Sequence, residues 1–352
     1  MHIGITFNLK SYYVAQGYSA EQVAEFDCEE TIDSIERVLL NEGHTVERIG
    51  CLEQLMKRLL DGERWDLVFN IAEGLNGIGR EAQIPALLDA YKIPYTFSPT
   101  EILATALDKG ITNAIMRTYR VKTADFHVVR KRADVKKVHI PFPLFVKPVA
   151  EGTSKGISYL SRVETEEDLQ ERCNYILDTF HQPALVEEFL SGREFTVGII
   201  GTGDDARVLG VMEITMTESA DQHAYTYDNK QQYEDRMRYT LVDEPEVARL
   251  ALKAWRAIHC RDAGRVDVRM NAEGEPCFLE VNPLAGLNPS YSDLCIMCRH
   301  LGFPYEELIG HIVAEACERM NPAANQNAVH LHATRNVNAA RHENCYFKRP
   351  LV

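Results

Sequence analysis

In the last third of the chain, two short alternating runs flank a turn that contains Gly274, a pattern that predicts a β-hairpin. In a symmetric hairpin, Asp267 lies opposite Glu280. Arg265 then lies opposite Asn282, because side chains alternate between the two faces of a strand. Two facing carboxylates repel and need a cation or a proton between them, and an all-oxygen ligand set suits Mg²⁺. The same residues also fit an ordinary charged surface hairpin, so this pattern alone leaves both interpretations open.

A second group of residues has the composition of an anion site. Lys147 ends an apolar strand-like run, and a buried ammonium needs a negative partner or a route to solvent. The loop that follows, 151–156, carries two glycines around small hydroxyl residues, so successive backbone N–H groups can turn toward a phosphate. The loop is not a Walker sequence, because no helix-opening Gly-Lys-Ser/Thr stands at the required spacing. Taken alone, it also fits an ordinary turn.

The first 100 residues alternate strand-like and helix-like segments. Strands are expected at 2–7, 45–49 and 67–71, with helices between and after them, which predicts a parallel, doubly wound sheet. Ligands bind beyond the carboxyl ends of such strands, so the segment with Glu73, followed by Arg80 and Glu81, is a candidate binding edge. These residues also fit turn and helix-capping roles.

Apolar periodicity predicts the helices that must position these groups. They are expected over 103–119, 165–180, 247–258 and 308–316, with another that starts at Asp293.

Two polar segments have no such periodicity. The stretch 217–238, which contains Lys230, is long for a connection, and loops of this kind tend to be lids. From Asn321 onward the chain is rich in Asn, His, Arg and Ala, and we expect this tail to be disordered or loosely docked.

Composition narrows the range of partners. The 352 residues are 45% hydrophobic and carry a formal charge of −14, which argues against general binding to nucleic acid or to an anionic membrane. No signal peptide and no run of 18 apolar residues is present, so we expect a cytoplasmic protein. The nine cysteines are expected to be reduced thiols, and the single Cys295-Ile-Met-Cys298 motif is a weak zinc or redox signal.

Taken together and in order, these segments identify a family. The chain resembles the ATP-grasp superfamily and, within it, the D-alanine–D-alanine ligase family over about residues 1 to 315. The resemblance rests on Asn70–Gly74, Ile93–Thr96, Ala106–Lys109, Leu144–Pro148, Glu151–Ile157, Val186–Glu194, Arg265–Asp267 and Leu279–Asn282 with Gly286. It implies an α/β fold in which a doubly wound parallel sheet precedes two α+β subdomains that clasp ATP. The expected boundaries are 1–105, 106–190, 191–318 and a tail at 319–352.

The resemblance also implies roles for particular residues. The nucleotide would be held by Lys109, Lys147, Glu151, Gly152, Thr153, Ser154, Gly156, Glu187, Glu188, Phe189, Leu190, Glu194 and Lys230. Asp267, Glu280 and Asn282 would ligate two Mg²⁺ ions, for which Mn²⁺ is an expected substitute. Arg265 and the backbone at Gly286 would stabilise an oxyanion, and Lys230 would reach the γ-phosphate.

The implied activity is an ATP-dependent carboxylate–amine ligase that joins small amino acids through an acyl phosphate and releases ADP and phosphate. A ligase for another small carboxylate is the alternative; a non-catalytic nucleotide-binding protein and a kinase-like transfer are remoter ones. A homodimer is expected because relatives often form one.

The part of the chain expected to bind amino acids departs from the family. Glu73-Gly74 stands where members that join two D-alanines usually have His-Gly, and 283–293 also differs. Asn288, Ser292 and Asp293 are candidate substrate contacts there. Ser292 and Asp293 fit equally well as the cap of the predicted helix.

Overall fold

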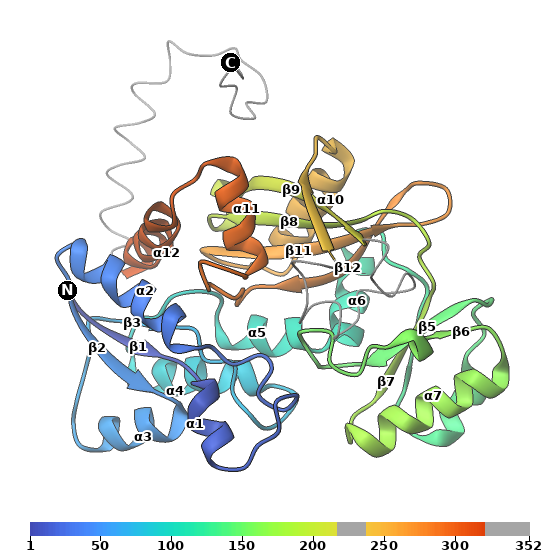
Figure 1. Ribbon diagram of the computed structural model, residues 1–352, viewed down its shortest axis with the longest axis horizontal. Helices are drawn as coiled ribbons and strands as arrows, with labels where there is room; N and C mark the ends of the chain where they lie inside the picture. Colours follow the sequence, from blue (N-terminus) through green and yellow to red (C-terminus); the bar gives the residue numbers. More distant parts are fainter. Residues whose placement is uncertain (217–236, 321–352) are drawn as a thin grey trace, which may run out of the picture.

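The computed structural model describes residues 1–216 and 237–320, which form three sheets with helices packed around them (Figure 1). The expected lid, with Lys230, falls almost wholly outside the described residues, as does the tail from Asn321. The N-terminal part comprises β1 (His2–Thr6), α1 (Lys10–Ala15), α2 (Glu29–Asn41), β2 (Thr45–Gly50), α3 (Leu52–Leu60), β3 (Leu67–Asn70) and α4 (Gln83–Tyr91).

The N-terminal sheet is parallel, with strand order β2-β1-β3. Ile3 and Ile5 of β1 share a buried core with Ile35 of α2. Val68 of β3 belongs to a different core, which it shares with Leu55 of α3 and residues of α4. Since side chains alternate across a strand, the two cores lie on opposite faces. The predicted doubly wound parallel sheet is therefore confirmed.

Two consecutive helices connect this sheet to the next. They are α5 (Thr100–Leu107) and α6 (Lys109–Thr118), so the prediction of one helix over 103–119 was wrong. Asp108 breaks the run, because its backbone is extended and its carboxylate accepts a hydrogen bond from the Ile111 N–H, as in a helix N-cap. The break places Lys109 at the start of α6.

The second sheet is antiparallel and has the order β4-β7-β5-β6. Its strands are β4 (Phe126–Val129), β5 (Leu144–Pro148), β6 (Arg162–Val163) and β7 (Ala184–Glu188). Helix α7 (Glu166–Thr179) covers one face, where Val146 and Val186 pack against Ile176. The alternation of side chains directs Lys147 and Glu187 to the other face.

The third sheet is antiparallel and has the order β10-β9-β8-β11-β12. Its strands are β8 (Glu194–Ile200), β9 (Arg207–Met216), β10 (Met237–Leu241), β11 (Ala263–Met270) and β12 (Pro276–Asn282). Helix α10 (Pro245–Ala257) packs Trp255 against the face that carries Val266 and Val268. Arg265 and Asp267 alternate with these valines and so point away from α10.

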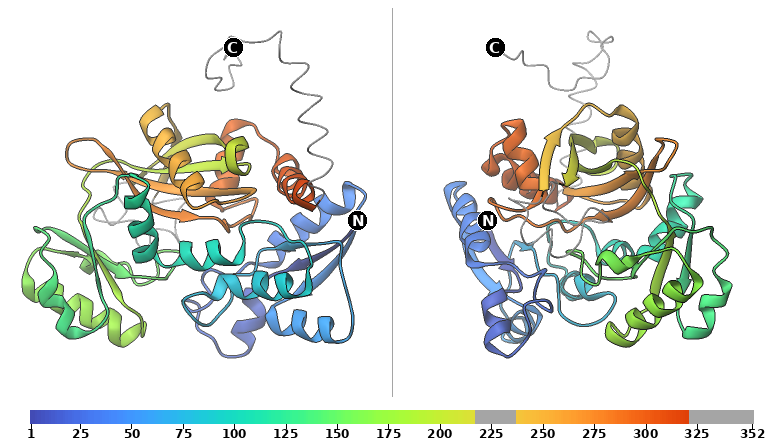
Figure 2. Two further views of the ribbon diagram at one scale, coloured as in Figure 1. Left: turned by 180° about the vertical axis from the view of Figure 1, so that it is seen from behind. Right: turned by 45° about the vertical axis from the view of Figure 1, so that its right-hand side comes forward.

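The last two helices are α11 (Asp293–Leu301) and α12 (Tyr305–Met320). Ile309 and Val313 of α12 share a core with Ile35 of α2 and with β1, so the end of the described chain packs against its beginning (Figure 2). Within residues 1–216 and 237–320, no helix has both the length and the apolar composition needed to cross a membrane.

Candidate active site

A cavity lies where the polar faces of the two antiparallel sheets meet. Most of the residues that the sequence implied for nucleotide binding line it: Lys109, Lys147, Glu151, Gly152, Thr153, Ser154, Glu187, Glu188, Phe189, Leu190 and Glu194. We call it the nucleotide cavity. Arg265, Asp267 and Glu280 from the hairpin line it as well. Gly156 does not, and its positive φ of 72° places it at a turn beside Phe180.

Lys147 has a negative partner, which is one of the two alternatives that its sequence context left open. Its side chain is buried, and its Nζ lies 2.7 Å from Glu187 Oε2. The Asn113 amide donates to the other oxygen of Glu187 at 3.0 Å. Burial alone would lower the pKa of Lys147, but Glu187 and Glu280 raise it above its usual value. Lys147 is thus a fixed positive charge on the cavity wall.

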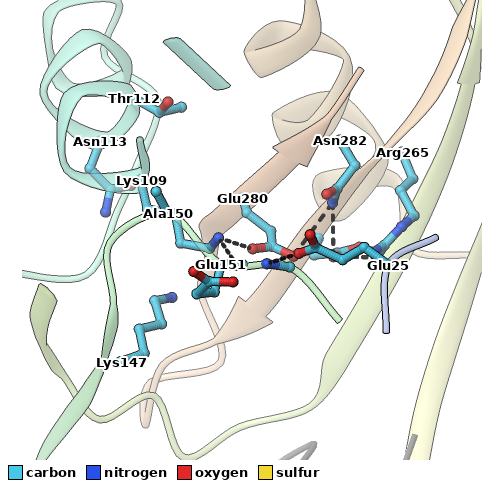
Figure 3. A network of polar contacts seen from close by, with 12 residues as sticks. Glu25, Lys109, Thr112, Asn113, Lys147, Ala150, Glu151, Arg265, Glu280 and Asn282 are labelled. Atoms are coloured by element: carbon cyan, nitrogen blue, oxygen red, sulfur yellow. Dashed lines mark hydrogen bonds and ion pairs between the residues drawn. The ribbon is translucent and has the colours of Figure 1, made fainter. Parts of the chain in front are cut away.

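Lys109 reaches the cavity from the first turn of α6. Its Nζ lies 3.1 Å from Glu280 Oε2 and donates to the backbone oxygen of Glu151 at 2.7 Å. Figure 3 shows Lys109 and Lys147 entering the same region from different elements. A polyanion bound between Lys109 and Lys147 would interact with both ammonium groups.

The hairpin has the predicted pairs at its polar positions, although a β-bulge between Asp267 and Val268 shifts the pairing by one residue toward the turn, so the hairpin is not symmetric. Asp267 pairs with Glu280 across β11 and β12, and Arg265 pairs with Asn282. The Arg265 guanidinium forms an ion pair with Asp267 and lies 3.6 Å from Asp293. Arg265, Asp267, Glu280 and Asn282 therefore share one face of the sheet, opposite α10.

The two carboxylates of this hairpin have pKa values that are shifted in opposite directions. Burial and the neighbouring Glu280 raise the pKa of Asp267 to about 7, although Arg265 opposes the shift. Burial also disfavours the charge on Glu280, but Lys109, Arg265 and Lys147 hold its pKa below its usual value. Of these two close carboxylates, Glu280 keeps its charge, and Asp267 is the one that more readily takes up a proton.

The residues present fit a hard cation. Asp267 Oδ1 is buried and makes no hydrogen bond within the described part of the chain, and the Asn282 amide lies 3.4 Å from oxygens of both carboxylates. Among residues 1–216 and 237–320, no group of three or more His, Cys, Asp or Glu side chains is arranged to hold a metal ion. A metal in this region would be held by two carboxylates and an amide oxygen, which suits Mg²⁺.

The glycine loop 151–156 forms the wall beside these lysines. Thr153 and Ser154 have left-handed backbone angles, with φ of 51° and 57°. Turns of this kind can direct backbone N–H groups into a shared concavity that suits an anion. The N–H groups of Gly152, Lys155 and Ile157 donate to protein oxygens instead. Lys155 Nζ lies 2.6 Å from the Glu151 carboxylate within the same loop.

A second, larger cavity of about 560 Å³ adjoins the first. The wall between them is formed by Lys109, Glu151, Gly152, Thr153, Arg265 and Glu280. We call it the amino-acid cavity. Its volume is in the range of small-molecule sites. Of the predicted substrate residues, Glu73, Ser292 and Asp293 line it, as do Gly286 and the metal-site candidate Asn282.

Two predicted substrate residues lie behind this wall. Arg80 is buried in the short 3₁₀ helix η1 (Arg80–Ala82), where it donates to Glu25. Asn288 is fully buried, and its amide donates to Thr31 at 3.0 Å while its backbone N–H donates to Ser292 Oγ. Neither lines the nucleotide cavity or the amino-acid cavity in the described structure.

Three carboxylates of the amino-acid cavity stand out by their environment. Burial raises the pKa of Asp27 to about 7, against weaker effects of a hydrogen bond from Thr31 and of Lys10. Burial likewise raises the pKa of Glu81 to about 7, with Glu25 and Glu280 adding to the shift. Burial also raises the pKa of Glu73 well above its usual value, and the Glu81 carboxylate adds to it. Within the described residues, none of the three forms an ion pair. This cavity favours a positively charged group.

Sequence reasoning missed Glu25 and Asp27. Both line the amino-acid cavity from the segment directly before α2. The available signal was the acidic residue at alternate positions, Glu25-Phe-Asp27, next to a predicted helix start. Lys155, also missed, lies in the glycine loop and lines the nucleotide cavity.

The Cys295 and Cys298 pair is not part of either cavity. Both thiols are buried in α11, and burial raises the pKa of Cys298 to about 12. A buried neutral thiol behaves as a small apolar side chain.

Known proteins are similar to this chain in sequence and in fold. A family model described as D-ala D-ala ligase C-terminus matches residues 109–314. A D-alanine–D-alanine ligase of Bordetella petrii is 31% identical over 255 residues, covering 70% of this chain and 76% of that protein. The corresponding ligase of Aquifex aeolicus is 30% identical over 288 residues, covering 80% and 92%.

Solved structures agree in fold. The crystal structure of the Bacillus anthracis D-alanine–D-alanine ligase complexed with ATP gives a TM-score of 0.69 at 19% identity, covering 92% of this chain and 99% of that one. The VanG D-Ala:D-Ser ligase of Enterococcus faecalis also gives 0.69, at 18% identity, covering 90% and 99%. The three sheets thus form the ATP-grasp fold, and by the extent of both the family match and the identity the chain belongs to the D-alanine–D-alanine ligase family.

Proposed function

We propose that this ATP-dependent, C–N bond-forming ligase joins two small amino acids. The observation that supports this proposal is the shared wall of the two cavities, where Lys109, Arg265 and Glu280 contact both. A phosphoryl donor in one cavity and a carboxylate in the other would meet at that wall. The products are ADP, phosphate and an amide.

The first step activates a carboxylate. One oxygen of the donor amino acid attacks the γ-phosphorus of ATP, ADP leaves, and an acyl phosphate forms. We assign Lys109, Lys147 and the glycine-loop N–H groups to the phosphates, because phosphoryl transfer depends mainly on positioning and positive charge. Glu187 to Leu190 would contact the adenine and Glu194 the ribose. Lys230, outside the described residues, stays a prediction for the γ-phosphate.

Asp267, Glu280 and Asn282 would hold Mg²⁺, with Mn²⁺ as a substitute. When bound, the metal ions neutralise charge that develops on the transferred phosphoryl group. Arg265 would remain beside them, tied to Asp267 and Asp293.

The second step forms the amide. The acceptor attacks the acyl carbon as a neutral amine, the C–O bond to phosphate breaks, and the nitrogen loses one proton, so that an amide, phosphate and a proton are formed. Arg265 and the Gly286 backbone N–H would stabilise the intermediate oxyanion, and removing one such donor costs roughly 100- to 1000-fold in rate. The cavity carboxylates Asp27, Glu73 and Glu81 supply negative charge for the substrate ammonium groups.

D-alanine is the first substrate to test, because the Bordetella petrii and Aquifex aeolicus relatives carry that activity in their names. A different amino acid or small carboxylate is the second candidate, favoured by Glu73 in the cavity wall and by the departures at 283–293.

Phosphate release tests the proposal. The full chain is incubated with ATP, Mg²⁺ and a panel of D- and L-amino acids, singly and in pairs, and products are identified by mass spectrometry. We expect one pair to give stoichiometric ADP, phosphate and dipeptide. Absence of release with every pair at millimolar concentration would refute dipeptide synthesis, and a phosphorylated product without an amide would indicate the kinase-like alternative. A homodimer and a cytoplasmic location stay predictions.

A further inference from the structure

Glu25 makes contacts that join three separate parts of the chain. It lies between α1 and α2, and its side chain is only 7% exposed. One oxygen accepts the Gly152 N–H at 2.6 Å, and both oxygens accept from Arg80 Nη2, at 3.0 and 2.8 Å. Lys155 Nζ lies 3.3 Å from the carboxylate. A single side chain of the N-terminal part thus holds both a backbone N–H and a lysine of the glycine loop.

Arg80 completes this connection from the end of the parallel sheet. Its second terminal nitrogen donates to the backbone oxygen of Ala150 at 2.9 Å, directly before the loop. Burial disfavours the charge on Glu25, yet Arg80 and Lys155 hold its pKa below the usual value, so it stays a carboxylate. The glycine loop is therefore tied to the N-terminal part by charge-assisted hydrogen bonds at Ala150 and Gly152 and by an ion pair at Lys155.

The glycine loop needs such a restraint. Thr153 and Ser154 both have positive φ, a conformation that costs L-residues roughly 1–2 kcal/mol each. The loop also fits Glu25 closely, because a Cβ on Gly152 would lie 2.6 Å from Glu25 Oε1. Gly152 is thus required by this contact rather than by its own backbone angles.

The position of Glu25 connects two binding events. The segment Ala24–Cys28 lines the amino-acid cavity, Ser154 and Lys155 line the nucleotide cavity, and Thr153 lines both. A ligand that orders the first segment also orders Glu25, and through it the loop. Coupling of this kind is reciprocal, so nucleotide binding must favour the amino acid by the same factor.

We propose that Glu25 is a positioning residue that holds the glycine loop closed over the nucleotide and couples this closure to occupancy of the amino-acid cavity. The inference rests on the proposed function for the identity of the ligands. The contacts of Glu25 with the glycine loop do not depend on that identity.

Hydrogen exchange of the ligand-free protein tests the restraint. Glu25→Gln keeps the size of the side chain but removes the charge that attracts Arg80 and Lys155. We expect amide exchange of 150–157 to accelerate at least tenfold while β1 and β3 keep their protection. Glu21→Gln, an exposed acidic residue of the same segment, is the matched control and should leave exchange unchanged. Unchanged exchange in Glu25→Gln, or equal acceleration throughout the chain, would overturn the proposal.

Binding measurements test the coupling. The affinity for a non-hydrolysable ATP analogue with Mg²⁺ is measured by calorimetry with and without the amino acid that gives phosphate release. We expect the amino acid to tighten nucleotide binding at least fivefold in the wild type and less than twofold in Glu25→Gln. Equal coupling in both proteins would overturn the proposal. If no amino acid supports phosphate release, the proposed function fails, but the exchange experiment still decides the role of Glu25.

A double-mutant cycle covers the case in which Glu25→Gln folds poorly. Gly152→Ala should accelerate exchange of the loop when Glu25 is present, because the new methyl group meets the carboxylate. In a Glu25→Ala background the same change should have less than a twofold effect. An equal effect in both backgrounds would show that Gly152 is required for another reason and would refute the contact.

Discussion

The two cavities share a wall but differ in how their charges are balanced. In the nucleotide cavity each lysine has a carboxylate partner: Lys147 with Glu187, Lys109 with Glu280, and Lys155 with Glu151 and Glu25. In the amino-acid cavity, Asp27, Glu73 and Glu81 have no ion pair within the described residues. The lysines of the first cavity are held by carboxylates of the protein, whereas the carboxylates of the second have raised pKa values and readily take up protons.

This difference assigns different tasks to the two cavities. Paired, buried charges fix geometry, and phosphoryl transfer demands fixed geometry. A carboxylate without an ion-pair partner is stabilised when a cation binds beside it. In the proposed function, the ammonium group of an amino acid is that cation. We therefore expect substitutions in the nucleotide cavity to abolish the reaction, and those in the amino-acid cavity to change which substrate is used and at what pH.

The largest effect is expected from Glu280→Gln. The change removes a charge shared by the proposed metal site and Lys109 while preserving the size of the side chain. Turnover, measured as phosphate release, should fall at least 1000-fold, since loss of single electrostatic groups costs roughly 100- to 1000-fold and a metal is lost as well.

Circular dichroism should show an unchanged fold for Glu280→Gln. Glu273→Gln, at the exposed turn of the same hairpin, is the control and should keep wild-type activity. Near wild-type turnover in Glu280→Gln would refute the metal assignment.

Lys147→Met should reduce both activity and stability. Removing one partner of a buried ion pair costs about 3–5 kcal/mol, because Glu187 is left buried and unpaired. We expect phosphate release to fall about 100-fold and the thermal midpoint to drop.

The double variant Lys147→Met with Glu187→Gln separates the two effects. The glutamine that replaces Glu187 can still accept from the Asn113 amide, so most of the stability should return while activity stays low. Recovery of activity together with stability would show that Lys147 has a structural role only.

The sequence was sufficient where local patterns decide the structure. Alternation around Gly274 predicted that Asp267 pairs with Glu280, although not the β-bulge beside this pair. The apolar run before Lys147 predicted a lysine with a negative partner or a route to solvent, and the partner is Glu187. The prediction of a single helix over 103–119 was wrong at Asp108. The carboxylate of Asp108 caps a new helix there, so the continuous apolar pattern forms two helices.

The sequence was also insufficient where distant segments meet. Glu25 contacts Gly152 across 127 positions, and no periodicity encodes such a contact. Arg80 and Asn288 were assigned to substrate from their neighbourhood in sequence, yet both are buried behind the cavity wall and bind protein groups. Burial of this kind depends on how whole elements pack.

A smaller effect concerns pH. Burial raises the pKa of Asp27 and Glu81 to about 7, against about 4 in an unfolded chain. The folded state therefore binds extra protons between these values, so this contribution to stability is full below about pH 4 and lost above about pH 7. The thermal midpoint of the ligand-free enzyme should fall as pH rises from 5 to 7.

Glu81→Gln removes one of the titrating groups, so the thermal midpoint should change less with pH than in the wild type. Glu101→Gln, at an exposed position of α5, is the control and should leave the pH dependence unchanged. Because a bound ammonium favours ionised carboxylates, the KM for the amino acid should decrease from pH 6 to pH 8 in the wild type. A KM that rises over that interval would contradict a cation-binding role for this cavity.

The smallest effect is expected from Ser292→Ala, which tests whether specificity lies in the carboxylates or in the loop before α11. Ser292 Oγ accepts the Asn288 N–H at 2.9 Å and does not cap α11 with its side chain. Its loss removes one hydrogen bond, worth about 0.5–1.5 kcal/mol, so the thermal midpoint should fall slightly and the amino-acid KM should rise less than about tenfold. A larger rise in KM with an unchanged midpoint would make Ser292 a direct substrate contact. Specificity would then depend on this loop as well as on Asp27, Glu73 and Glu81.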